Sequence, residues 1–391
     1  MNKDQRNKEK TSYIKILLHS NCIRHMNLDL YHLLLAVFSV MFIMQLFYFF
    51  YFFIRLSFHK NKPISKINDG LSIIIAARNE CENLKKYLPS ILNQQHPDFE
   101  VIVVNDRSWD KTAEILIEFQ KTHAHLKIVT IPDLGKDNFS KKFAITLGIK
   151  AAKNEILVFT DADCYTISNQ WLLNISVSSE DEKMISLGAG PYKKIKGFLN
   201  ALIRFDAVLI ATQYLSMAKA NLPYMGVGRN LSYKKTIYNK IQGFKSHYHI
   251  PSGDDDLFIN QAADSKNTKV VFNEQSLTYS IAENSFKKWA TQKIRHLKTS
   301  PLYNLKTKIL IGFYPISLFG FYLALITTLF LTNDFIFVLI LLTLRTLFQI
   351  IVFFKPLKIM GSKELVIFTP LLEIILLFIY PFLHIKKIQK P

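Results

Sequence analysis

The stretch Leu71-Ser-Ile-Ile-Ile-Ala-Ala77 decides the fold, because a short, β-rich apolar run of this kind suits a strand buried on both faces. The residues that follow it, from Asn79 to Gln95, carry apolar side chains at helical spacing. The same alternation predicts strands at 101–104, 126–131 and 156–160, and helices at 112–121 and 141–152. This order of strands and helices implies an α/β fold with a parallel, right-handed, doubly wound sheet.

Polar clusters follow three of the predicted strands. They are Ala77-Arg-Asn-Glu80, Asn105-Asp-Arg-Ser-Trp-Asp110 and Asp161-Ala-Asp-Cys164. Any one of them could simply cap a strand or the next helix. Ligands of such sheets bind beyond the carboxyl ends of the strands, so three clusters at one edge indicate a binding site.

The pair Asp161 and Asp163 predicts a metal site. Two carboxylates one residue apart at a strand end can project into one crevice, where Mg²⁺ or Mn²⁺ could bind them and bridge diphosphate oxygens. Asp106, at the end of a neighbouring strand, could accept hydrogen bonds from a base or a ribose.

Two further motifs lie beyond the regular alternation. Gly226-Val-Gly-Arg-Asn230 suits a tight turn near a ligand, but it lacks the spacing of a nucleotide cradle. Ser252-Gly-Asp-Asp-Asp-Leu257 places three carboxylates in a row. Crowded acids raise one another's pKa, which suits a general base, whereas the alternative is an acidic helix N-terminus favoured by the helix dipole.

The composition points to a membrane protein. The chain has 391 residues, a net charge of +19 and 49% hydrophobic residues, which excludes a disordered chain, and its three cysteines exclude a disulfide framework. Apolar runs at 28–56, 309–331, 335–354 and 365–384 are long enough to span a bilayer as helices. The positive charge forms no single stripe, so we expect membrane lipids as partners and no nucleic acid.

These runs divide the chain into regions. A soluble region at 57–300 would end in an interfacial helix, 284–300, with Phe286 and Trp289 at the membrane surface. The lysines of the 355–363 loop place this region in the cytoplasm, as part of a multi-pass protein of the cell (inner) membrane. The basic segment 1–27 disagrees with that topology, so either translation starts at Met26, or 1–27 is an amphipathic surface segment and the first span is re-entrant. Arg345 and Glu373 would meet near mid-membrane.

Taken together, these motifs resemble the membrane-anchored family 2 glycosyltransferases, inverting enzymes of the GT-A fold. The resemblance covers roughly Leu71 to Ser300 and implies a Rossmann-like, nucleotide-sugar-binding domain with flanking transmembrane helices. It also implies a nucleotide-sugar donor, a lipid-linked or saccharide acceptor, and Mg²⁺ or Mn²⁺.

The resemblance extends to individual residues. It implies that Asp254 is the catalytic base, with Asp255 as a rival if the register shifts by one, and that Asp163 is the metal ligand, with Asp161 beside it. His296 stands where processive synthases have tryptophan, so we do not expect processive polymerisation. Gly253 stands where many relatives have glutamate, which leaves the fold assignment intact and the subfamily open. The implied donor-binding residues are Ala77, Arg78, Asn79, Glu80, Asp106, Lys141, Asp161, Gln292, Arg295 and His296.

The reaction implied by the resemblance is sugar transfer from a UDP-sugar in cell-envelope polysaccharide or glycolipid synthesis. Two alternatives stay open. One is a polyprenyl-phosphate sugar transferase, which would make a lipid-linked sugar. The other is a non-catalytic membrane scaffold that binds a nucleotide sugar, although the retained aspartates argue against lost catalysis.

Overall fold

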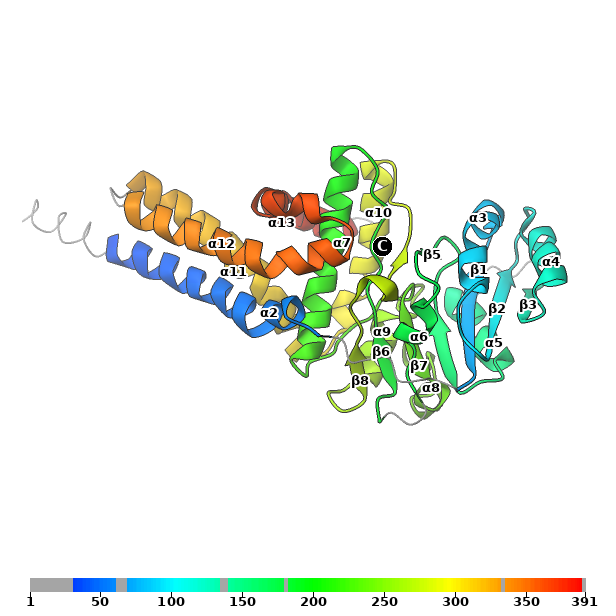
Figure 1. Cartoon of the computed structure of the whole chain (residues 1–391). Coiled ribbons are helices and arrows are strands. Elements are labelled where there is room, and N and C mark those ends of the chain that lie inside the picture. The colour runs from blue at the N-terminus through cyan, green and yellow to red at the C-terminus, as the bar shows by residue number, and fades with distance from the viewer. Residues whose placement is uncertain (1–30, 61–68, 134–139, 179–181, 332–334, 389–391) are drawn as a thin grey trace, which may run out of the picture. The chain divides into compact units, whose positions relative to one another are not determined.

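The structure, a computed structural model, describes residues 31–60, 69–133, 140–178, 182–331 and 335–388, so the segment 1–27 lies outside the described residues. The larger of its two sheets has seven strands in the order β3-β2-β1-β4-β7-β6-β8 (Figure 1). Its strands are β1 Leu71–Ala77, β2 Phe99–Asp106, β3 Leu126–Ile131, β4 Ile156–Phe159, β6 Ile185–Leu187, β7 Leu231–Lys234 and β8 Thr268–Val270. A two-stranded sheet pairs β5 Tyr165–Thr166 with β9 Thr278–Tyr279.

The first half of the sheet is parallel, as the sequence predicts. β1 pairs in parallel with β2 and β4, and β2 pairs in parallel with β3. Beyond the four predicted strands the sheet is mixed, because β7 runs antiparallel to both β4 and β6.

Helices cover both faces of the parallel half, which explains its continuous apolar strands. Ile73 and Ile75 pack with residues of α3 (Cys81–Leu92) and α4 (Thr112–Thr122) in one buried cluster. The opposite face meets α5 (Lys141–Ala151), where Gly148 lies so close to Ile74 that an added Cβ would stand 2.6 Å from it.

The remaining short helices lie in the second half of the domain. They are α6 Trp171–Ile175, α8 Lys235–Lys240, α9 Asp256–Ala262 and the 3₁₀ turns Lys245–His247, Glu274–Ser276, Ser300–Leu302 and Lys363–Phe368. The predicted interfacial helix at 284–300 is shorter, since α10 runs from Phe286 to Leu297, with Ser285 accepting a hydrogen bond from the Lys288 amide. Trp289 of α10 is fully buried and therefore faces protein.

In the part of the chain that the structure describes, five helices are long and apolar enough to cross a membrane: Tyr31–Ser57, α7 Phe198–Lys219, α11 Leu305–Leu331, α12 Phe335–Ile359 and α13 Thr369–Ile388. Their length and composition associate the protein with membranes. The sequence predicts four of these helices as membrane spans. It does not predict α7, which has the lowest mean hydropathy of the five. Residues of α7 such as Arg204 and Asp206 are buried charges, and these interrupt its apolar run.

The chain divides into two compact units. The smaller comprises residues up to Tyr48 together with Ile311–Phe348, and it packs Phe38 and Phe42 against Phe321. Within it, Arg345 donates to the Gln45 side chain at 2.9 Å and lies over the ring of Phe321. Glu373 belongs to the other unit, so its contact with Arg345 stays a prediction.

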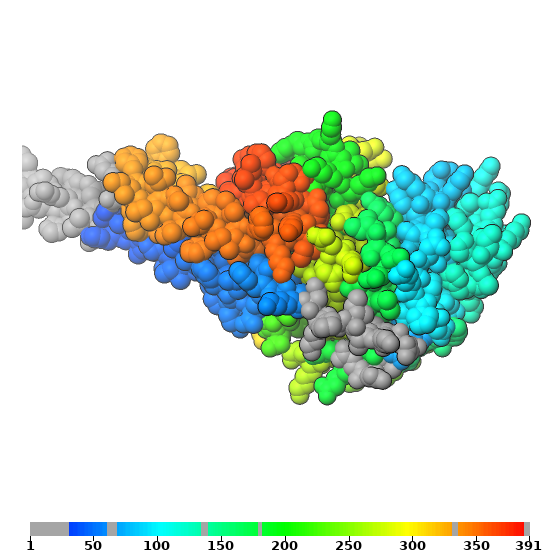
Figure 2. All heavy atoms as spheres, viewed as in Figure 1, coloured from blue at the N-terminus to red at the C-terminus, as the bar shows by residue number. Residues whose placement is uncertain are grey.

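The larger unit contains the sheet together with α7, α10 and α13. α13 packs on both α7 and α10, and its surface borders that of α7 in the space-filling view (Figure 2). Asp206 of α7 joins the three helices, because its carboxylate forms an ion pair with Lys293 of α10 and accepts a hydrogen bond from the Tyr380 hydroxyl of α13 at 2.5 Å. The three helices α7, α10 and α13 are therefore connected by buried polar contacts.

Candidate active site

The loops that follow β1 and β2 are hydrogen-bonded to each other. Asn79, whose φ is +57°, donates its amide to the Ser108 hydroxyl at 2.9 Å and accepts from the Trp109 amide at 3.0 Å. The Glu80 amide donates to the Thr112 hydroxyl at 2.9 Å. These bonds fix two of the predicted polar clusters as one edge of the site, with Ala77 buried at the end of β1.

Two arginines belong to this edge. The exposed Arg78 guanidinium lies over the Trp109 ring, 5.6 Å from its centre. Arg107, whose φ is +52°, forms a buried ion pair with Asp106, with 2.7 Å between Nε and Oδ1. The sequence predicts Asp106 alone as the residue that binds the base of the nucleotide. In the structure, the Asp106 carboxylate is already paired with Arg107. Arg107 directly follows Asp106 in the cluster Asn105–Asp110, and this adjacency was the sequence signal for their ion pair.

Three predicted residues from distant parts of the chain meet at the carboxyl edge of the sheet. The Lys141 ammonium lies 2.6 Å from an Asp161 oxygen and 3.3 Å from an Asp254 oxygen. Lys141 opens α5, Asp161 follows β4 and Asp254 precedes α9, so three elements converge on one ammonium group. These side chains also line a small hollow with Thr160, Gly228 and Tyr233.

The charges of this group adjust one another. Partial desolvation lowers the pKa of Lys141, but Asp161 and Asp254 more than offset it and hold that pKa well above its usual value. Desolvation likewise raises the pKa of Asp161, and Lys141 outweighs it, so this carboxyl stays ionised. The result is an ionised lysine between two carboxylates.

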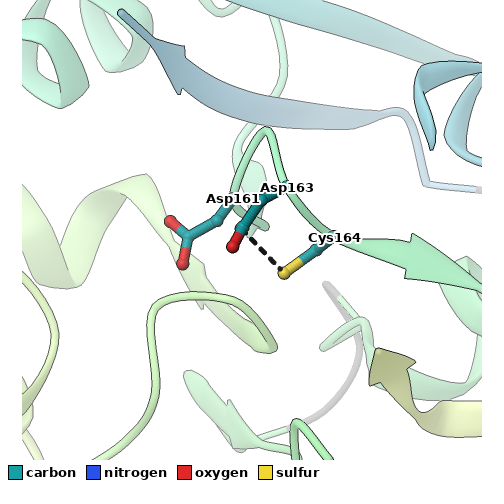
Figure 3. A group of neighbouring side chains, drawn as sticks. All are labelled: Asp161, Asp163 and Cys164. Atoms are coloured by element: carbon teal, nitrogen blue, oxygen red, sulfur yellow. Dashed lines mark hydrogen bonds between the residues drawn. The ribbon is translucent and has the colours of Figure 1, made fainter. Parts of the chain in front are cut away.

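The second carboxylate of the pair behaves differently. Burial and the neighbouring Asp161 charge raise the pKa of Asp163. The buried Cys164 thiol donates to an Asp163 oxygen at 3.5 Å, and Figure 3 shows this contact beside Asp161. One ligand atom from each of the three residues lies within 4.8 Å of the others. Burial raises the pKa of Cys164 well above its usual value, so as a free thiol it is no nucleophile.

The three consecutive aspartates have separate environments. Asp255 accepts from the Gly228 amide at 2.7 Å and from the Asp256 amide at 2.8 Å, so it caps α9. Asp256 accepts from the Thr299 hydroxyl, the Tyr303 hydroxyl and the Leu257 amide. Asp254 alone of the three lines the hollow. The glycine-rich turn thus holds the acidic motif through Gly228.

A pH-dependent stability is expected from Asp255. Burial, with Asp254 and Asp256, raises its pKa to about 7. The folded protein therefore holds this proton more tightly than the unfolded chain, so its stabilising contribution is complete below about pH 4 and is lost as the pH rises through about 7.

We expect Asp255→Asn to raise the melting temperature at pH 8 by several degrees, ~4 °C per kcal/mol, and to change it little at pH 4. Thermal unfolding in detergent at both pH values would check this. An Asn variant that is less stable at pH 8 would show that the ionised carboxylate is needed as the cap.

Arg229 is a site residue that was not predicted from the sequence. Its guanidinium lies over the Tyr192 ring, 4.5 Å from the centre, and donates to the Ser280 hydroxyl at 3.2 Å. Its charge adds to the effect of Lys141 in lowering the pKa of Asp161 and opposes the burial and the Asp161 charge that raise the pKa of Asp163, so Arg229 lies within electrostatic reach of the metal motif. The signal was an arginine inside the glycine-rich turn 226–230.

The helix α10 brings further cations to the site. The charge of Arg295 lowers the pKa of Asp161, so the two lie within electrostatic reach. Desolvation and the nearby charges of Lys293, Arg295 and Arg229 lower the pKa of His296 to about 3, which keeps its imidazole neutral. Gln292 lies one turn before His296 on the same helix.

Part of the chain is similar to known proteins. Residues 72–244 match the description "Glycosyl transferase family 2". The chain is 35% identical over 115 residues to the poly-beta-1,6-N-acetyl-D-glucosamine synthase of Staphylococcus epidermidis, covering 27% of each protein. It is 30% identical over 196 residues to the 4,4'-diaponeurosporenoate glycosyltransferase of Staphylococcus haemolyticus, covering 49% of this chain and 51% of that one. The matches thus span about a quarter to a half of these relatives.

A solved structure shares the fold. It is a mannosyltransferase from Pyrobaculum calidifontis in complex with GDP-Man and Mn²⁺, with a TM-score of 0.54 and 16% identity. The likeness covers 87% of this chain and 97% of the other. The predicted GT-A fold is confirmed by this likeness.

Proposed function

We propose that the chain is a family 2 glycosyltransferase of the GT-A fold, which transfers a sugar from a UDP-sugar to a lipid-linked or glycan acceptor. The product would contribute to cell-envelope polysaccharide or glycolipid. The observation that carries this proposal is the convergence of Lys141, Asp161 and Asp254 at the carboxyl edge of the sheet. The GDP-Man named in the solved mannosyltransferase complex of similar fold agrees with a nucleotide-sugar donor.

Asp254 is the proposed general base. The other two aspartates of the motif, Asp255 and Asp256, use their carboxylates in hydrogen bonds within the protein, whereas Asp254 lines the hollow. The acceptor hydroxyl would lose its proton to the Asp254 carboxylate while its oxygen attacks the anomeric carbon. The bond from that carbon to the diphosphate oxygen breaks in the same step, so the anomeric configuration inverts.

Lys141 connects donor binding to this base. Its ammonium lies between Asp161 and Asp254. A diphosphate would attract the ammonium away from Asp254 and so free that carboxylate to accept the proton. Arg229 and Arg295 would add positive charge where the nucleoside diphosphate leaves. The loops that follow β1 and β2, with Glu80 and Asp106, would hold the nucleoside.

A divalent metal fits the carboxylates of Asp161 and Asp163. Their ligand atoms lie within 4.8 Å of each other and of the Cys164 sulfur, and oxygen donors suit Mg²⁺ and Mn²⁺. When bound, the ion would offset charge on the leaving diphosphate as a Lewis acid. The thiol would orient Asp163 through its hydrogen bond.

Removing metal or its ligand tests that part of the proposal. We expect Asp163→Asn to weaken Mn²⁺ binding about 10- to 100-fold, measured by electron paramagnetic resonance titration, and EDTA to stop turnover. Asp98→Asn is the control, because this exposed carboxylate pairs with Lys153. Turnover that persists in EDTA would remove the metal from the mechanism.

The substrate class is tested with purified full-length protein and a panel of UDP- and GDP-sugars. Release of the nucleoside diphosphate is measured with and without membrane lipid extracts, and any labelled lipid or glycan is then isolated. We expect release from one UDP-sugar to increase when the acceptor is present. A protein that binds the donor but transfers to no acceptor pool would support the scaffold alternative.

We further propose that the protein is a multi-pass membrane protein with its catalytic domain in the cytoplasm. The lysines of the 355–363 segment support this orientation. Cysteine labelling from each side of the membrane, at single cysteines placed in that segment, would test it.

A further inference from the structure

Lys142 has an unusual position for a charged residue. It is the second residue of α5, directly after the site residue Lys141, and its side chain is fully buried. Its ammonium donates to the backbone carbonyls of His247, at 2.5 Å, and Ile250, at 3.0 Å. Both carbonyls belong to the segment 245–253, which leads to Asp254.

The burial of this lysine is not explained by global stability. Its partners are carbonyl groups, and among the described residues no carboxylate lies within ion-pair distance of it. Burial lowers the pKa of Lys142 to about 8, with Asp254, Asp256 and Asp255 opposing that effect. Both of its hydrogen bonds go to one short segment of the chain, so the contacts support a contribution that is local to that segment.

The bound segment determines where Asp254 lies. The Ile250 amide also donates to the His247 carbonyl, at 3.1 Å, so Lys142 closes a turn in the chain. Three residues later Gly253 has a φ of +94°, and a Cβ there would stand 2.5 Å from a Leu257 methyl group. The backbone that leads from this turn to Asp254 is thus restrained at one end by the Lys142 hydrogen bonds and at the other by the conformation of Gly253.

We propose that Lys142 is a positioning residue that holds segment 245–253, and with it the backbone of Asp254, in the place from which the base acts. Lys141 contacts the Asp254 side chain and Lys142 the preceding backbone, so the first turn of α5 fixes the base twice. Misplacement of a catalytic group by about 1 Å can cost 100-fold in rate. This inference rests on the proposed function of Asp254.

The test compares Lys142→Met with Lys150→Met, an exposed lysine of the same helix. For Lys142→Met we expect an unchanged or higher melting temperature, unchanged affinity for the nucleoside diphosphate, and a kcat at least about 10-fold lower. Hydrogen exchange should increase in 245–253 and stay unchanged in β1 and β2. Lys142→Gln, which can still donate to one carbonyl, should lie between Lys142→Met and the wild type in both exchange and kcat. We expect Lys150→Met to match the wild type in every measurement.

Three results would overturn the proposal. The first is that Lys142→Met leaves hydrogen exchange in 245–253 unchanged. The second is that exchange increases there while kcat stays normal. The third is that the melting temperature falls and exchange increases throughout the domain. If the wild type transfers no sugar, the proposed function fails. The exchange comparison would then still decide whether Lys142 holds the segment.

Discussion

Asp254→Asn is expected to lower the transfer rate about 100- to 10,000-fold, the usual contribution of a general base, while the affinity for the nucleotide sugar changes little. The amide keeps the shape of the side chain but cannot accept the acceptor proton. Because Asp254 contacts Lys141 at the edge of the hollow, the loss should fall on kcat. Single-turnover transfer and donor titration by calorimetry would measure the two effects separately.

Asp255→Asn is the matched control for this prediction. Its carboxylate binds the amides of Gly228 and Asp256, and asparagine is also a good helix cap. We therefore expect it to retain transfer within about an order of magnitude, since no proton needs to reach it. If instead Asp255→Asn abolishes transfer and Asp254→Asn does not, the base is Asp255 and the register of the motif is off by one.

The fold was predictable where a local pattern carries the information. The run Leu71–Ala77 appears as β1, and the predicted strand 126–131 appears as β3 with the same bounds. The antiparallel β7 was not predictable in this way, because four residues, Leu-Ser-Tyr-Lys, do not specify which strand they pair with. α7 was missed because Arg204 and Asp206 interrupt its apolar run, and only tertiary contacts neutralise them.

The candidate site was predictable to the level of its acidic motifs. Asp161 and Asp254 could be selected because both lie in recognisable patterns near the edge of the sheet. Their common partner Lys141 came from the family resemblance, and its bridging position could not be derived from spacing, since 113 residues separate Lys141 from Asp254. Arg229 and Lys142 act through contacts with residues that are distant in the sequence, so sequence patterns give no partner for these two side chains, whereas Arg107 pairs with its neighbour Asp106.

Breaking the buried ion pair between Asp206 and Lys293 is the second change with a large expected effect. The two side chains are 1% and 9% exposed, and they connect α7 with α10, the helix that carries Arg295. Lys293→Met would leave the Asp206 carboxylate with the Tyr380 hydroxyl. Removing one partner of a buried pair costs about 3–5 kcal/mol. We expect a matching fall in the free energy of unfolding in detergent and a lower kcat, because α10 loses its attachment.

Two comparisons separate the ion pair from general damage to the helices. The double variant Asp206→Asn with Lys293→Met removes both charges, so it should recover most of the lost stability. Lys194→Met breaks an exposed pair with Glu364, whose side chains are 62% and 41% exposed, and should cost less than about 1 kcal/mol. A double variant no more stable than Lys293→Met would show that the buried charge is not the cause. Equal losses in Lys194→Met and Lys293→Met would show that burial does not set the size of the effect.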